Sequence, residues 1–271
     1  MHNEFEKEEK YKLYRKVKEI LHPTISKKNI SDYKIIVGEE LLPIRVFYPK
    51  KVSNLKNVII YVHGDSKITN CQEKYSEISS EFAKELDRLV ISIDYNEDDE
   101  LDTIYKEVSK TFNYIYNELI THNIEKDNIT VLGDSTGGAI VLQLVDGLDI
   151  NSLVLFYPVL SGEYFGKTNY SSIIENDKID HDLVSKLKDY YKGRENDKEL
   201  FYLSKDKKNI PETLLLIGNV DPLIDEAKAF ADSSKKVKLD IVGFANHGFL
   251  NTNDKEIKKE FFDFINKFLS R

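Results

Sequence analysis

The stretch "GDSTGG", from Gly133 to Gly138, decides the fold, because it sets a serine between an apolar run and a segment with helical spacing. Residues 128–134 before it are typical of a buried strand, and residues 135–148 are typical of a helix. The pattern Gly-x-Ser-x-Gly is typical of a strained strand-to-helix turn, where side chains at the glycines would collide with the helix. We therefore interpret Ser135 as a candidate nucleophile. The alternative is a tight turn that simply needs glycine.

Strands and helices alternate on both sides of this turn. Short apolar runs at residues 57–64, 88–95, 151–159, 212–219 and 236–243 predict strands, and residues 72–87, 101–122, 222–234 and 254–271 predict helices. Two further strands are expected at residues 33–38 and 42–49, and a charged amphipathic helix at residues 5–21. The alternation predicts an α/β fold, with a mostly parallel sheet and helices on both of its faces.

The region 160–209 breaks this alternation, because it is polar, rich in aromatic residues and only weakly periodic. No repeat or linker divides the chain, so we expect one domain over residues 1–271, with a small cap formed by residues 1–30 and 160–209. The aromatic residues of this region either line an apolar pocket or pack the cap onto the core. They are Tyr164, Phe165, Tyr170, Tyr190, Tyr191, Phe201 and Tyr202.

The composition of the chain limits the kinds of partner and the cellular location that we expect. The net charge of −8 and the scattered lysines disfavour nucleic-acid binding, and no apolar run is long enough to span a membrane. The N-terminal residues are charged, and the single cysteine, Cys71, excludes an intramolecular disulfide, so we expect a cytoplasmic protein. Cys71 lacks flanking glycines and is a poor rival nucleophile. No acidic run has the spacing of metal ligands.

A serine nucleophile needs a base and an acid that orients the base. His247, in "GFANHGF" after the last expected strand, is the best candidate base, whereas His63 closes a strand and suits loop support. Asp221 directly follows the strand at 212–219 and is the best candidate acid, although it could instead be the N-cap of a helix that starts at Pro222. Asp225 is the competing acid, and we expect it inside that helix and facing away.

Several of these segments resemble the hormone-sensitive-lipase-like esterases of the α/β-hydrolase superfamily, which have a Gly-Asp-Ser-Ala-Gly-Gly turn. "GDSTGG" differs from that motif only at Thr136, and "GNVDPLIDEA" and "NHGF" are similar to the acid and histidine segments of the family. The resemblance runs from about residue 57 to the C-terminus. It implies the α/β-hydrolase fold, with Ser135 as nucleophile, His247 as general base and Asp221 as its orienting acid.

One departure from the family concerns the oxyanion hole. Where the family has His-Gly-Gly-Gly, this sequence has His63, Gly64, Asp65 and Ser66. Backbone N–H donors do not require glycine, so we expect Asp65, Ser66 and Thr136 to form the hole, with His63 and Gly64 as loop support. A carboxylate at Asp65 would oppose the developing negative charge unless it points away or is paired.

We therefore predict a serine carboxylesterase that hydrolyses short- to medium-chain acyl esters through an acyl-enzyme on Ser135. It needs no cofactor and no metal, and its expected partner is a small-molecule ester. The alternatives are a non-catalytic ligand-binding or sensor protein, which the Asp65–Ser66 departure motivates, and an amidase or small-peptide hydrolase.

Overall fold

The computed structural model describes residues 20–21, 30–37, 40–50, 55–64, 74–161, 181–194 and 209–270. Contacts group the chain into two compact units: Met1–Tyr61 with Ser79–Thr130, and Val62–Ile78 with Val131–Arg271. Three residues of the sequence-based hypothesis, Asp65, Ser66 and Cys71, lie outside the described residues, as does most of the expected cap. Residues 20 and 21 are helical and buried, and the rest of the expected helix at 5–21 is not described.

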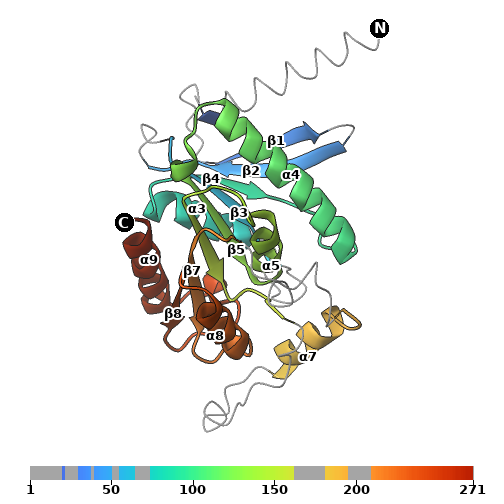
Figure 1. Ribbon diagram of the computed structural model, residues 1–271, viewed down its shortest axis with the longest axis vertical. Helices are drawn as coiled ribbons and strands as arrows, with labels where there is room; N and C mark the ends of the chain where they lie inside the picture. The colour runs from blue at the N-terminus through green and yellow to red at the C-terminus, as the bar shows by residue number, and fades with distance from the viewer. Residues whose placement is uncertain are drawn as a thin grey trace. The chain divides into compact units, whose positions relative to one another are not determined.

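The first unit contains the antiparallel part of the sheet. Strands β1 (Ile30–Val37) and β2 (Glu40–Phe47) pair antiparallel, as do β2 and β4 (Leu89–Ile93), and the order continues through β3 (Val58–Val62) to the start of β5. Every residue of β3 and β4 is buried, which explains their unbroken apolar sequences. Helix α4 (Leu101–Thr121) packs against β1 and β4 (Figure 1) with an apolar face of residues spaced three or four apart.

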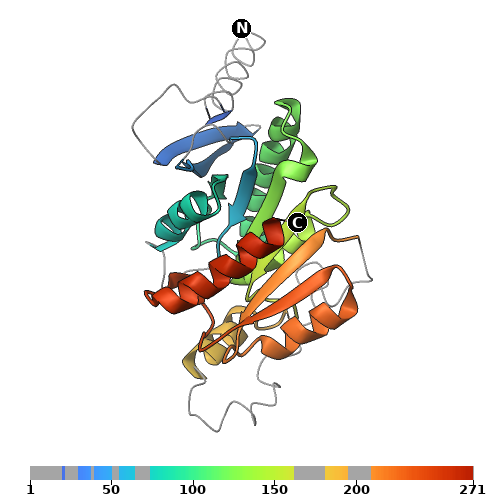
Figure 2. The same cartoon turned by 90° about the vertical axis from the view of Figure 1, so that its left-hand side faces the viewer.

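The second unit contains the parallel part. Strand β5 (Ile129–Asp134) lies between the end of β3 and β6 (Ser152–Phe156), followed by β7 (Glu212–Gly218) and β8 (Val237–Val242). The β6–β7 and β7–β8 pairs are parallel. Helices α8 (Ile224–Ser233) and α9 (Lys255–Leu269) pack on opposite sides of β7 and β8 (Figures 1 and 2). The carboxyl ends of β5, β7 and β8 therefore bring their following loops to one edge, where ligands bind in such sheets.

These elements confirm the predicted α/β fold with a mostly parallel sheet. They also correct two helix boundaries. Helix α5 (Ser135–Leu144) ends before the predicted residue 148, and α8 begins at Ile224 with Leu223 as its N-cap, so the helix does not start at Pro222. The later start has a physical cause: the Asp221 carboxylate accepts the Leu223 N–H at 2.8 Å, which forms a separate turn before the helix.

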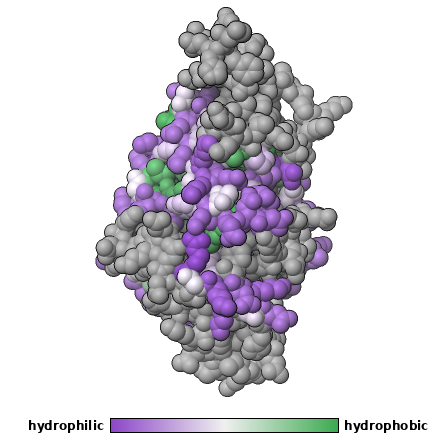
Figure 3. All heavy atoms as spheres, turned by 90° about the vertical axis from the view of Figure 1, so that its right-hand side faces the viewer, coloured by the Kyte–Doolittle hydropathy of each residue, from purple (hydrophilic) through white to green (hydrophobic). Residues whose placement is uncertain are grey.

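Hydrophilic side chains predominate among the described residues on the face shown in Figure 3, and the hydrophobic ones form small separate groups. Two more α-helices, α3 (Lys74–Glu85) and α7 (His181–Tyr190), and two short 3-10 helices, η2 (Lys126–Asn128) and η5 (Phe249–Asn251), lie in the described residues. Of the helices in the described ranges, none has the length and apolar character needed to cross a bilayer.

Candidate active site

Ser135 occupies a strained position at the start of α5. Its φ of 49° lies in the left-handed region, which serine rarely adopts, whereas Asp134 before it has extended backbone. The Val159 N–H donates to the Ser135 carbonyl oxygen at 3.2 Å and holds this turn against the segment after β6. The turn points the Ser135 side chain out of the strand end, as expected for a nucleophile in this motif.

The structure shows why "GDSTGG" has glycine at residues 133 and 137. A Cβ on Gly133 would lie 2.6 Å from Val141 Cγ2 and 2.8 Å from the Gly137 carbonyl oxygen. A Cβ on Gly137 would lie 2.3 Å from the carbonyl oxygens of both Val62 and His63. Glycine is therefore required because α5 packs directly on β5 and on the end of β3, and no side chain fits between them.

Ser135, His247 and Asp221 form a continuous hydrogen-bonded chain. Ser135 Oγ lies 2.9 Å from His247 Nε2, and His247 Nδ1 lies 3.0 Å from Asp221 Oδ2 and 3.3 Å from Asp221 Oδ1. The carboxylate can only accept, so Nδ1 carries the proton and Nε2 is free to accept the serine proton. The side chains of His247 and Asp221 have no exposed surface, and Ser135 is also fully buried.

The loops that follow β7 and β8 bring the acid to the histidine. The Val220 N–H donates to the Ala245 carbonyl at 3.3 Å, and the Asn219 N–H donates to the Val242 carbonyl at 3.1 Å. A Cβ on Gly218 would lie 2.0 Å from the Ala245 carbonyl oxygen, so only glycine permits this approach. These contacts hold the two loops together, so that Asp221 and His247 come within hydrogen-bond distance of each other.

Asp225, the competing acid, lies away from this chain. It is in the first turn of α8, its side chain is 35% exposed, and it pairs with Lys228 at 3.7 Å. Asp221 is fully buried and combines two contacts, one to His247 and one to the Leu223 N–H that starts the turn before α8. The structure thus brings Asp221, and not Asp225, to His247.

His63 and Gly64 lie at the start of the loop expected to carry the oxyanion donors. His63 Nδ1 donates to the Gly64 carbonyl at 2.8 Å, and the ring stacks on Tyr75 with centroids 4.4 Å apart. Burial lowers the pKa of His63 to about 4, against a smaller raising effect of the Gly64 bond, so the ring is neutral at pH 7. Its contacts are those of a loop-supporting histidine.

Asp134 is a site residue that the sequence reading missed. It is fully buried, and its Oδ1 accepts the Gly64 N–H at 2.9 Å. The residue before the candidate nucleophile therefore fixes the loop that begins at His63. Its position inside the motif was the available signal, but its partner lies 70 residues earlier in the chain.

Tyr157, also missed, packs against the candidate base. Its ring centroid lies 4.7 Å from that of His247 and 4.9 Å from that of Phe249, and its φ is 37°. Burial, with a further contribution from the Asp134 carboxylate, raises the pKa of Tyr157 well above its usual value. A neutral aromatic ring thus holds the imidazole plane from one side.

Glu226 places a second buried carboxyl close to Asp221. Its Oε1 accepts the Leu160 N–H at 2.8 Å, and the residue has no exposed surface. Burial raises the pKa of Glu226 well above its usual value, the Leu160 bond opposes this, and the Asp221 charge adds to it. The side chain is therefore expected to be a neutral acid in the folded protein.

Glu226→Gln should change how stability depends on pH. A raised folded-state pKa means that the unfolded chain loses its proton first, so this group lowers the free energy of unfolding as the pH rises through that interval. The slope is about 1.4 kcal/mol per pH unit. We expect the variant, which keeps an acceptor for Leu160, to become more stable relative to the native chain between pH 5 and pH 7, as measured by urea unfolding.

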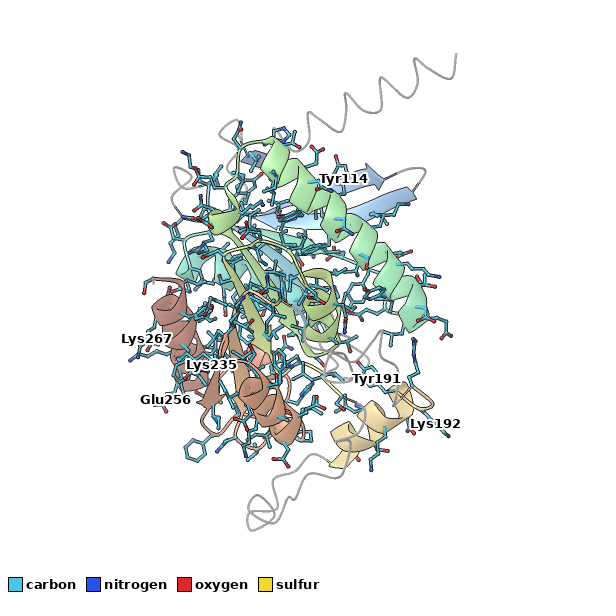
Figure 4. All side chains as sticks on the ribbon, viewed as in Figure 1. Tyr114, Tyr191, Lys192, Lys235, Glu256 and Lys267 are labelled. Carbon is cyan, nitrogen blue, oxygen red and sulfur yellow. The ribbon has the colours of Figure 1, made fainter. Side chains whose placement is uncertain are left out.

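The matched control is Glu256→Gln at the start of α9, where the side chain is exposed (Figure 4). It makes the same Glu→Gln change at an exposed carboxyl without changing a buried group. Equal pH dependence of stability in the native chain and in Glu226→Gln would show that Glu226 is ionised in the folded protein.

The described residues contain no group of three His, Cys, Asp or Glu side chains that could hold a metal ion.

Comparisons with known proteins agree with the fold described above. A model of a family with the alpha/beta hydrolase fold matches residues 59–251. An arylesterase of Saccharolobus solfataricus is 24% identical over 84% of this chain and 79% of its own length. A thermophilic carboxylesterase cloned from a metagenomic library has a similar structure, with a TM-score of 0.71, 22% identity and 96% of each chain covered. An esterase from the bacterial hormone-sensitive lipase family has a TM-score of 0.71 and 19% identity, covering 92% of this chain and 86% of its own.

Proposed function

The chain belongs to the α/β-hydrolase fold family, whose hormone-sensitive-lipase-like esterases its motifs resemble, and we propose that it is a serine carboxylesterase. The observation that carries the proposal is the buried chain of hydrogen bonds from Ser135 Oγ through His247 to Asp221. Three separated segments of the sequence supply these groups in the order serine, acid, histidine, which is the order of this fold.

In the first half of the reaction, Ser135 Oγ attacks the ester carbonyl carbon while His247 Nε2 takes the hydroxyl proton. The tetrahedral intermediate then collapses, and the leaving alcohol departs with the proton that His247 returns to it. Asp221 keeps the proton of the imidazole on Nδ1 and stabilises the imidazolium that forms. The product of this half is an acyl-enzyme on Ser135.

In the second half, water takes the place of the alcohol. His247 accepts a proton from the water, the hydroxide adds to the acyl carbon, and collapse releases the acid while Ser135 regains its proton. Each half begins and ends with a neutral histidine. No other proton carrier is needed.

The oxyanion is proposed to bind at the start of α5. Thr136 is near the N-terminus of that helix, where the first N–H groups lack intrahelical acceptors and the helix dipole is positive. We propose the backbone N–H groups of Asp65 and Ser66 as the other donors. Asp134 supports this arrangement because it holds the Gly64 N–H directly before them.

The substrates we propose are short- to medium-chain acyl esters, including aryl esters. The similarity to an arylesterase and to a carboxylesterase supports ester chemistry. A fully buried Ser135 suits a small ester that enters the site singly rather than an insoluble triglyceride surface.

The proposal is tested with p-nitrophenyl esters from acetyl to dodecanoyl. We expect turnover highest at short chains, and mass spectrometry of a rapidly quenched reaction should show an acyl mass on the peptide that contains Ser135. Binding of esters without an acyl mass would support a ligand-binding protein instead. Turnover of p-nitroanilides faster than of the matching esters would support an amidase.

A further inference from the structure

We infer that Tyr191 and Thr136 form a latch that positions the oxyanion-donating N–H beside Ser135. The two hydroxyl oxygens lie 2.8 Å apart, and both residues are buried. The inference rests on the proposed function, because it assigns a role to the residue after the nucleophile. Tyr191 and the Thr136 hydroxyl are positioning groups in this scheme and do not touch the substrate.

The Thr136 hydroxyl is the chain's own departure from the family motif, where alanine follows the serine. Thr136 is only 1% exposed, and a buried hydroxyl needs a hydrogen-bond partner to be tolerated. The next two residues, Gly137 and Gly138, have no side chain. Of these three residues after Ser135, Thr136 alone has a side chain that can form a hydrogen bond. A bond to its hydroxyl therefore acts directly on the first turn of α5.

Tyr191 reaches this turn from the end of α7. Leu187 and Tyr191, four residues apart on one helical face, are buried, whereas Lys186, Lys188 and Lys192 are exposed. Figure 4 shows Tyr191 and Lys192 at the end of the helix.

The backbone fixes the end of α7. The Tyr191 N–H donates to the Leu187 carbonyl at 3.1 Å, and Gly193 has a φ of 81°, as is common just after a helix. The phenol is therefore presented from a defined helix end.

The hydrogen bond between Thr136 and Tyr191 should fix the direction in which the Thr136 backbone N–H points. Ser135 is held in a left-handed conformation, and a small rotation of the following peptide would turn that N–H away from the developing oxyanion. The latch opposes such a rotation by tying the Thr136 side chain to α7. It should stabilise the transition state more than the bound ester, and so affect kcat rather than KM.

The test compares Tyr191→Phe, Thr136→Ala, Thr136→Ser and the double variant Thr136→Ala/Tyr191→Phe. Both single removals of the bond should lower kcat about tenfold with KM nearly unchanged, and affinity for a trifluoromethyl ketone should fall in parallel. Thr136→Ser keeps the hydroxyl and should restore native kcat. The double variant should be no slower than the slower single variant, because both changes remove one interaction.

Several results would overturn the latch. One is a kcat within twofold of native in both single variants. Another is a loss of thermal stability with no change in kcat and in ketone affinity, which is what a purely structural contact would give. Multiplying effects in the double variant would also contradict it, because the two groups would then act separately.

Labelling of Ser135 by a fluorophosphonate separates this inference from the proposed function. Ser135 Oγ attacks phosphorus, fluoride leaves, His247 takes the proton, and the phosphoryl oxygen occupies the oxyanion site. If the native chain reacts with the probe but hydrolyses no ester, the proposed esterase function is wrong. In that case a tenfold slower labelling of Tyr191→Phe than of the native chain still supports the latch. Equal labelling rates would reject the latch even if ester hydrolysis is confirmed.

Discussion

Ser135→Ala should reduce ester hydrolysis by at least about 10⁴-fold while leaving the fold intact. The hydroxyl that is removed lies 2.9 Å from His247 Nε2, and no other hydrogen-bond partner of this atom is found among the described residues. Alanine lacks the oxygen that would form the acyl-enzyme, and it fits the left-handed backbone of residue 135 about as poorly as serine. Steady-state hydrolysis of p-nitrophenyl butyrate, with circular dichroism of both proteins, measures the effect.

The matched control is Ser79→Ala. Ser79 is also fully buried but belongs to α3, so the same atom is removed from the interior without touching the site. Its kcat should stay within about twofold of native. A Ser135→Ala variant that retains a tenth or more of native turnover would remove Ser135 from the mechanism and leave the motif as a turn that needs glycine.

The fold could be predicted because most strands of the central sheet are short, apolar and buried along nearly their whole length. Apolar runs such as those of β3 and β7 predict strands without any tertiary information. The spacing of the apolar residues in α4 predicts a helix in the same way. The start of α8 could not be predicted in this way. A carboxylate that belongs to the site takes the N–H of Leu223 and delays the helix, which is a local competition between side chain and backbone.

The site residues also fall into those that a local sequence pattern predicts and those that depend on distant contacts. Ser135, Asp221 and His247 were predictable as candidates because each stands in a short motif directly after a strand. The roles of Asp134, Glu226 and Tyr191 depend on partners 70, 66 and 55 residues away, and no pattern along the sequence encodes those pairs. The sequence identifies the aromatic residues of the 160–209 region, but it does not decide whether each of them lines a pocket or packs against the core. For Tyr191, burial and the bond to Thr136 favour the contact.

Asp221→Asn should lower kcat by about 10³–10⁴-fold. Asparagine has nearly the same shape, and its Oδ1 can still accept the Leu223 N–H, so the turn before α8 should persist. Its NH₂ group, however, would donate to His247 Nδ1, which lies 3.0 Å from the present carboxylate oxygen. The imidazole would then carry its proton on Nε2, the atom that has to accept the proton of Ser135. The loss should therefore appear in kcat with little change in melting temperature.

Asp225→Asn is the control that decides between the two acids of this segment. Its carboxylate is 35% exposed and pairs only with Lys228 among the ion pairs of the described residues, a contact whose loss costs at most about 1 kcal/mol. Its kcat should remain within about twofold of native, because no atom of Asp225 bonds to His247. If Asp225→Asn were the slower variant, the acid would be misassigned, and the Asp221–His247 bond would be a structural contact. If both variants were slow to the same extent, the negative charge of the whole segment, rather than an orienting hydrogen bond, would be what stabilises the imidazolium.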